Sequence, residues 1–66
     1  MELTNTQKKQ IIENELMNYH SSVYQLELRG RAAKIVGNAE VEKNILAEIE
    51  KHLKIIDFLE KELKEK

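Results

Sequence analysis

The strongest constraint on this chain is a single break in its helical periodicity, at Gly37-Asn38. On both sides of the break, apolar residues recur at alternating spacings of three and four, the pattern of one face of an α-helix. Glycine adopts the left-handed conformation that ends a helix, and asparagine caps the start of the next one. We therefore predict an all-α fold, a coiled-coil-like antiparallel hairpin with helices at about residues 4–36 and 39–64 and a turn at 37–38.

The segment before the break carries a start signal and an apolar stripe. Thr4 and Gln7 have the spacing of a capping box. The stripe follows a seven-residue repeat through Ile12, Leu16, Tyr19, Val23, Leu26, Gly30 and Ala33. A glycine inside a helix costs about 1 kcal/mol relative to alanine. Gly30 therefore either allows close approach of the facing helix or marks a bend or fray.

The segment after the break carries a matching stripe. Its members are Ile45, Leu46, Ile49, Leu53, Ile56, Leu59 and Leu63, and Val41, Ile55 and Phe58 widen it. Folding about the break pairs residues whose numbers sum to about 75, so Gly30 faces Ile45 and Leu26 faces Ile49. Acid–base pairs four residues apart predict a solvated outer side, namely Glu50–Lys54, Asp57–Lys61, Glu60–Lys64 and Glu62–Lys66.

A second apolar stripe on the first segment predicts a partner. Met17, Tyr24, Leu28 and Ile35 cluster about 150° from the first stripe at 100° per residue. A helix of an isolated hairpin needs one apolar stripe, whereas this one has two. We therefore expect an oligomer or partner interface, and its expected residues are Met17, Tyr24, Leu28 and Ile35 together with Ile55 and Phe58.

The size of the chain points in the same direction. A chain of 66 residues forms one domain, residues 1–66, and buries little surface by itself. It has no cysteine and hence no disulfide or thiolate zinc site to stabilise it. A homodimer or higher even oligomer of hairpins would form a four-helix bundle and bury the additional faces.

The sequence offers little basis for catalysis or for a cofactor, and we expect neither. Its only histidines are His20 and His52, and neither follows a glutamate by three residues, as a di-iron bundle requires. Glu48 and His52 are four apart and leave a metal site across a dimer axis as a distant alternative. No glycine-rich phosphate loop is present.

The only basic cluster, Arg29, Arg31 and Lys34, supports an alternative function as a small dimeric nucleic-acid-binding regulator. A nucleic-acid surface usually has more basic residues and aromatic platforms. Glu27 is also spaced to pair with Arg31. The overall net charge of −1 gives no strong attraction to a polyanion, so nucleic acid is the weaker expectation.

The chain lacks an apolar run of the roughly 18 residues that span a membrane, and its first residues do not resemble a signal peptide. We expect a cytoplasmic protein without a membrane partner. The expected function is that of a small non-enzymatic protein–protein interaction module: a regulator, inhibitor, chaperone or assembly factor. Many phage and mobile-element accessory proteins share this design.

Overall fold

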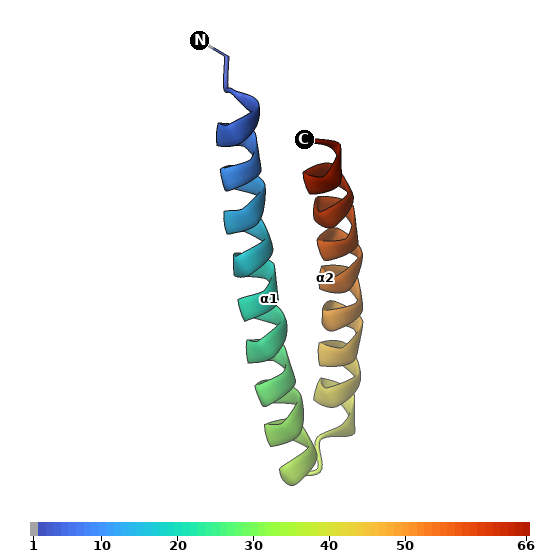
Figure 1. Ribbon diagram of the computed structural model, residues 1–66. Coiled ribbons are helices and arrows are strands. Elements are labelled where there is room, and N and C mark those ends of the chain that lie inside the picture. The colour runs from blue at the N-terminus through green and yellow to red at the C-terminus, as the bar shows by residue number, and fades with distance from the viewer. Residues whose placement is uncertain (1) are drawn as a thin grey trace.

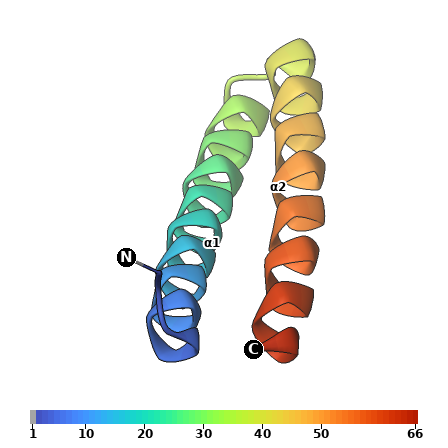
Figure 2. The same cartoon turned by 90° about the horizontal axis from the view of Figure 1, so that it is seen from above.

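The computed structural model describes residues 2–66, which form two long antiparallel helices. Helix α1 spans Asn5–Ile35 and helix α2 spans Ala39–Glu65. The two helices lie side by side along their lengths in both views (Figures 1 and 2). The molecule is a rod with extents of 51 × 18 × 14 Å. The predicted all-α hairpin is confirmed.

The start of α1 is fixed by the predicted capping box. The Gln7 backbone N–H donates to Thr4 Oγ1 at 3.1 Å, and the Thr4 N–H donates to Gln7 Oε1 at 2.9 Å. These two bonds satisfy backbone donors that have no partner within the helix. The helix then continues through Gly30 to Ile35, so the alternative of a frayed segment after this glycine is wrong.

The turn combines a helix stop with a helix start. Gly37 has φ = 74°, the left-handed conformation expected just past a helix end. The Gly37 N–H donates to the Lys34 carbonyl at 3.2 Å and the Asn38 N–H donates to the Ala33 carbonyl at 2.9 Å, which is the bonding of a Schellman motif. Asn38 Oδ1 then accepts from the Val41 N–H at 3.2 Å and caps α2. The chain thus reverses within three residues.

The seam between the helices is narrow and follows one register. In α1 the predicted stripe is the least exposed part of the helix. The seam positions of α2 are Glu42, Ile45, Ile49, His52, Ile56, Leu59 and Leu63. Each number pairs with one in the α1 stripe to a sum of about 75, as expected for an antiparallel hairpin. A Cβ placed on Gly30 would lie 3.5 Å from Ile45 Cγ2, so these two residues do face each other.

Two leucines assigned to the α2 stripe lie outside the seam. Leu46 is 61% exposed and Leu53 is 52% exposed, so their predicted place in the seam is wrong. Glu42 and His52 lie half-buried in the positions that the register requires. The reason is rotational: Leu46 and Leu53 each follow a seam residue by one position, and one residue turns the side chain by about 100°.

The outer sides of the helices are polar, with few ion pairs. Among the described residues, Asp57 and Lys61 form a predicted pair, with an Oδ2–Nζ distance of 3.1 Å. The other pair joins Glu48 and Lys51 at 3.3 Å and has a spacing of three, which was not predicted. Both pairs are well exposed, so each contributes at most a few tenths of a kcal/mol. The outer side is solvated, but ion pairs do not hold it together.

The hairpin has very little interior. Val23, Ala33 and Ile56 are its only buried hydrophobic residues within the described chain, and none of them is below 2% exposure. The Cα radius of gyration is 15.5 Å, whereas a compact domain of this length has about 11 Å. The seam therefore buries one line of side chains and leaves the rest of the apolar surface in contact with solvent.

Candidate interaction surface

The six predicted contact residues all lie on the outside of the hairpin. Their exposed fractions range from 38% at Ile55 to 85% at Ile35, and the set comprises Met17, Tyr24, Leu28, Ile35, Ile55 and Phe58. None of them contributes a buried side chain to the seam. They are available to a partner, but they do not form one continuous face.

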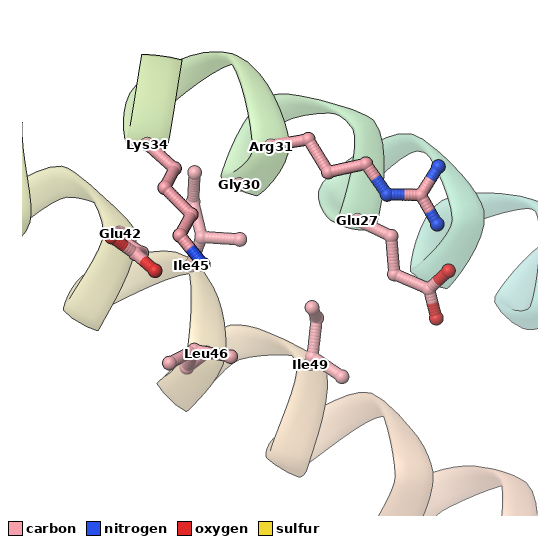
Figure 3. A pocket seen from close by; sticks show the side chains of 8 residues that line it. All are labelled: Glu27, Gly30, Arg31, Lys34, Glu42, Ile45, Leu46 and Ile49. Atoms are coloured by element: carbon pink, nitrogen blue, oxygen red, sulfur yellow. The ribbon is translucent and has the colours of Figure 1, made fainter. Parts of the chain in front are cut away.

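The two helices place these residues on different sides of the seam. Leu46 of α2 lines a pocket together with Glu27 and Arg31 of α1, which identifies one long side of the hairpin (Figure 3). Leu53 lies seven residues after Leu46 and thus on the same side, which we call the pocket flank. Ile55 precedes the buried Ile56 by one position and Phe58 follows it by two. At 100° per residue, both side chains therefore lie on the other side of α2 from Leu46 and Leu53, which we call the far flank.

Met17, Tyr24, Leu28 and Ile35 form the outer stripe of α1. Tyr24 and Met17 precede Arg31 by seven and fourteen residues, so they share its side of the helix. The outer stripe thus begins at the pocket flank and continues around the back of α1. Because Ile55 and Phe58 occupy the far flank, one flat partner could not cover all six predicted residues.

The pocket is a shallow hollow between the two helices near the turn end of the rod. Its volume is about 220 Å³. Its lining residues are Glu27, Gly30, Arg31, Lys34, Glu42, Ile45, Leu46 and Ile49 (Figure 3). The apolar part of this lining comes from α2 and from the bare backbone of Gly30. Since Gly30 has no side chain, the α1 wall is recessed at this point.

The rim of the pocket carries both signs of charge. Arg31 and Lys34 bring two cations, whereas Glu27 and Glu42 bring two carboxylates. In Figure 3 the Lys34 side chain extends from α1 toward α2, whereas the Arg31 guanidinium points along α1 away from the hollow. The expected Glu27–Arg31 ion pair is not among the two pairs that the described residues form. A balanced rim of this kind favours an uncharged guest over an anion or a cation.

The basic cluster does not form a positive patch. Arg29 lies about 200° around α1 from Arg31, so the two guanidinium groups leave the helix on different sides. Arg31 and Lys34 share their surroundings with Glu27 and Glu42. Phosphate binding depends on several unopposed cations in one place. The geometry therefore gives no specific support to the nucleic-acid alternative.

His52, which lies in the seam, forms a hydrogen bond within its own helix. His52 Nδ1 lies 2.7 Å from the Glu48 carbonyl oxygen, a distance at which Nδ1–H donates a hydrogen bond. Its ring meets the edge of Tyr19 at a centroid distance of 5.6 Å and an interplanar angle of 64°. The Glu48 carboxylate turns instead to Lys51. Glu48 and His52 therefore do not converge on a common point.

Metal-ligating side chains do not gather elsewhere in the part of the chain that the structure describes. Residues 2–66 contain no group of three or more histidine, aspartate or glutamate side chains that could hold a metal ion.

Neither helix is long and apolar enough to cross a membrane. The surface features that remain are apolar: the outer stripe of α1, the pocket flank and the far flank.

Leu46 and Leu53 are surface residues that the sequence interpretation placed in the seam. They have the same spacing of seven as Ile45 and His52, and the predicted stripe contained Ile45 as well as both leucines. The register with α1 decides between the two rows, and it selects the row that contains Ile45.

Comparison of the chain with protein-family models, with curated proteins and with solved structures finds no match.

Proposed function

We propose that this protein is a small non-enzymatic interaction module of the cytoplasm that works as an oligomeric helical bundle. One of its exposed apolar surfaces joins copies of the hairpin, and another presents a helical face to a different protein. Regulators, inhibitors, chaperones and assembly factors act in this way. The surface left apolar by the seam supports the proposal.

The accessible surface of the hairpin is larger than that of a typical monomer of its mass. The hairpin exposes 5473 Å². A typical globular monomer of 7.8 kDa exposes about 4,400 Å², so the excess is about 1,100 Å². A standard protein–protein interface covers about 800 Å² on each partner. The excess therefore has the size of an interface.

The chemical nature of the exposed surface agrees with its size. Twelve large hydrophobic residues in the described chain are at least 38% exposed. Single exposed hydrophobic residues are ordinary on soluble proteins. Eight of the twelve belong to the outer stripe of α1, the pocket flank and the far flank, and grouped apolar residues of this kind are typical of interaction sites.

The test is the molar mass in solution, measured by light scattering coupled to size exclusion over a range of protein concentrations. We expect about twice the chain mass of 7.8 kDa, or a higher even multiple. A constant mass of one chain up to millimolar concentration would refute self-association.

A double variant, Tyr24→Glu with Leu28→Glu, tests the outer stripe of α1. A variant that becomes monomeric would assign self-association to this stripe, whereas one that stays oligomeric leaves the stripe for a different protein. Gln25→Glu is the matched control, because it adds a carboxylate to an exposed polar position of the same helix.

A further inference from the structure

We infer that the self-association surface is the pocket flank, and that a second copy of the hairpin docks on it in antiparallel orientation with its Leu53 in the pocket beside Leu46. This inference rests on the proposed function and specifies its partner. It leaves the part of the outer stripe that lies around the back of α1 to a different protein.

The two leucines of this flank can pair with each other across a two-fold axis. Leu46 and Leu53 are separated by seven residues, which is about 10.5 Å along α2. A two-fold axis perpendicular to the rod, midway between them, places each leucine opposite the other one in the second copy. Such an isologous contact is the commonest way in which identical chains form a closed dimer.

The pocket lies where this arrangement brings the second leucine. Its apolar lining is Gly30, Ile45, Leu46 and Ile49, so Leu46 itself forms one wall. A cavity of about 150 Å³ accepts a benzene molecule, and the hollow measures about 220 Å³. The hollow is therefore large enough for a leucine side chain from the second copy. The same contact forms twice, once in each copy.

The charges around the pocket suit this guest. Two cations and two carboxylates form the rim, so a strongly charged partner would meet repulsion from one pair or the other. The second copy has a net charge of −1 and offers an uncharged leucine at the centre of the contact. Antiparallel docking also places each turn beside the far end of the other α2, so the four helices alternate in direction.

The area balance is consistent with one such contact. The surface in excess of a typical monomer, about 1,100 Å², is close to the roughly 800 Å² that each partner of a standard interface covers. The pocket flank alone includes two leucines with exposures of 61% and 52%. An interface of standard size on this flank would bring the hairpin into the ordinary range of exposure.

Cysteine cross-linking tests the docking and its direction, because the chain has no native cysteine. Under mild oxidation, we expect the double variant Leu46→Cys with Leu53→Cys to form a covalent dimer as its main product. Each single variant should give at least five-fold less, because identical positions are about 10.5 Å apart along the axis and disulfides need Cα atoms within about 7 Å. The matched control is Leu46→Cys with Phe58→Cys, which should resemble the single variants.

Two cross-linking results would contradict this docking. Efficient cross-linking of the Leu46→Cys single variant would show parallel docking and overturn the inference. A double variant that cross-links no better than the Phe58 control would also overturn it.

Charge substitution separates this inference from the proposed function. We expect Leu46→Glu with Leu53→Glu to be monomeric at concentrations where the wild type is dimeric. Circular dichroism and the milder pair Leu46→Ala with Leu53→Ala, expected to raise the dimer Kd at least ten-fold, control for loss of fold. If the wild type is dimeric and the glutamate variant remains so, this inference fails while self-association stands. If the wild type is monomeric, both fail.

Discussion

The two helices of the hairpin distribute their apolar residues in different ways. In α1 the apolar residues lie on two nearly opposite sides, the seam and the outer stripe, so no single face dominates. In α2 they form one broad band, with the seam at its centre and exposed residues on each flank. A single neighbouring helix can pack against the centre of the one band of α2. The two stripes of α1 lie on nearly opposite sides, so a single neighbour covers only one of them.

This difference divides the work between the helices. The centre of the α2 band contacts α1, and its pocket-flank edge is the surface that we propose for a second copy. The outer stripe of α1 has no neighbour within the hairpin. The seam, the turn and the outer stripe should therefore contribute to the stability of the hairpin to different degrees.

The largest expected effect separates two neighbouring isoleucines of α2. Ile56 is 4% exposed and Ile55 is 38% exposed. Ile56→Ala should lower the free energy of unfolding by about 2–5 kcal/mol, since it leaves a cavity in the seam. Ile55→Ala should cost less than about 1 kcal/mol. Urea unfolding at one fixed protein concentration measures both, and equal losses would show that the band of α2 is not centred on the seam.

The turn fixes the register that brings the two stripes together. Gly37 has a left-handed backbone, and a Cβ added to it would meet nothing within 4 Å. Gly37→Ala should therefore cost about 1–2 kcal/mol through the backbone alone. Gly37→Asn is the control and should cost less, because asparagine tolerates this conformation. Thermal unfolding compares the two, and an alanine variant as stable as the wild type would contradict the left-handed turn.

The second glycine should respond in the opposite direction. Gly30 lies within α1, and an added Cβ would make an ordinary contact with Ile45 at 3.5 Å. Gly30→Ala should raise the free energy of unfolding by about 0.5–1 kcal/mol, because alanine favours the helix. Chemical unfolding of this variant beside Gly37→Ala gives the sharper comparison. Destabilisation at both sites would mean that the helices approach more closely at Gly30 than the structure shows.

The smallest effect is expected on the outer stripe. Met17 is 70% exposed and Leu28 is 44% exposed. Met17→Gln and Leu28→Gln should each change hairpin stability by less than about 0.5 kcal/mol, because the helix propensities are similar and no seam contact is lost. A loss above 1 kcal/mol that depends on protein concentration would instead place the outer stripe in the self-association contact.

The hairpin was predictable because its signals are local. Thr4 with Gln7, and Gly37 with Asn38, define helix ends through side chains and backbone conformations that act within a few residues. The heptad stripe of α1 also emerged directly, since it has one seam residue at each expected position.

The rotation of α2 about its own axis could not be read in the same way. Ile45 and Leu46 are adjacent and equally apolar, and so the sequence of α2 alone does not say which one faces α1. The choice depends on the facing helix, where recessed Gly30 accepts Ile45. The predicted stripe included both leucines together with Ile45, and this concealed the pocket flank, because Leu46 and Leu53 lie outside the seam. The outer stripe was easier to find because its separation from the first stripe is a property of α1 alone.

The short turn places the start of α1 and the end of α2 at the same tip of a rod 51 Å long (Figure 1). Residue 66 and the first turn of α1 therefore lie at the same end of one hairpin. In an antiparallel pair of hairpins the last residues of the two copies would lie at opposite ends of the assembly, whereas in a parallel pair they would lie at the same end. A fluorophore attached to the last residue of each copy would therefore report pairing direction by energy transfer, without altering any residue of the helices.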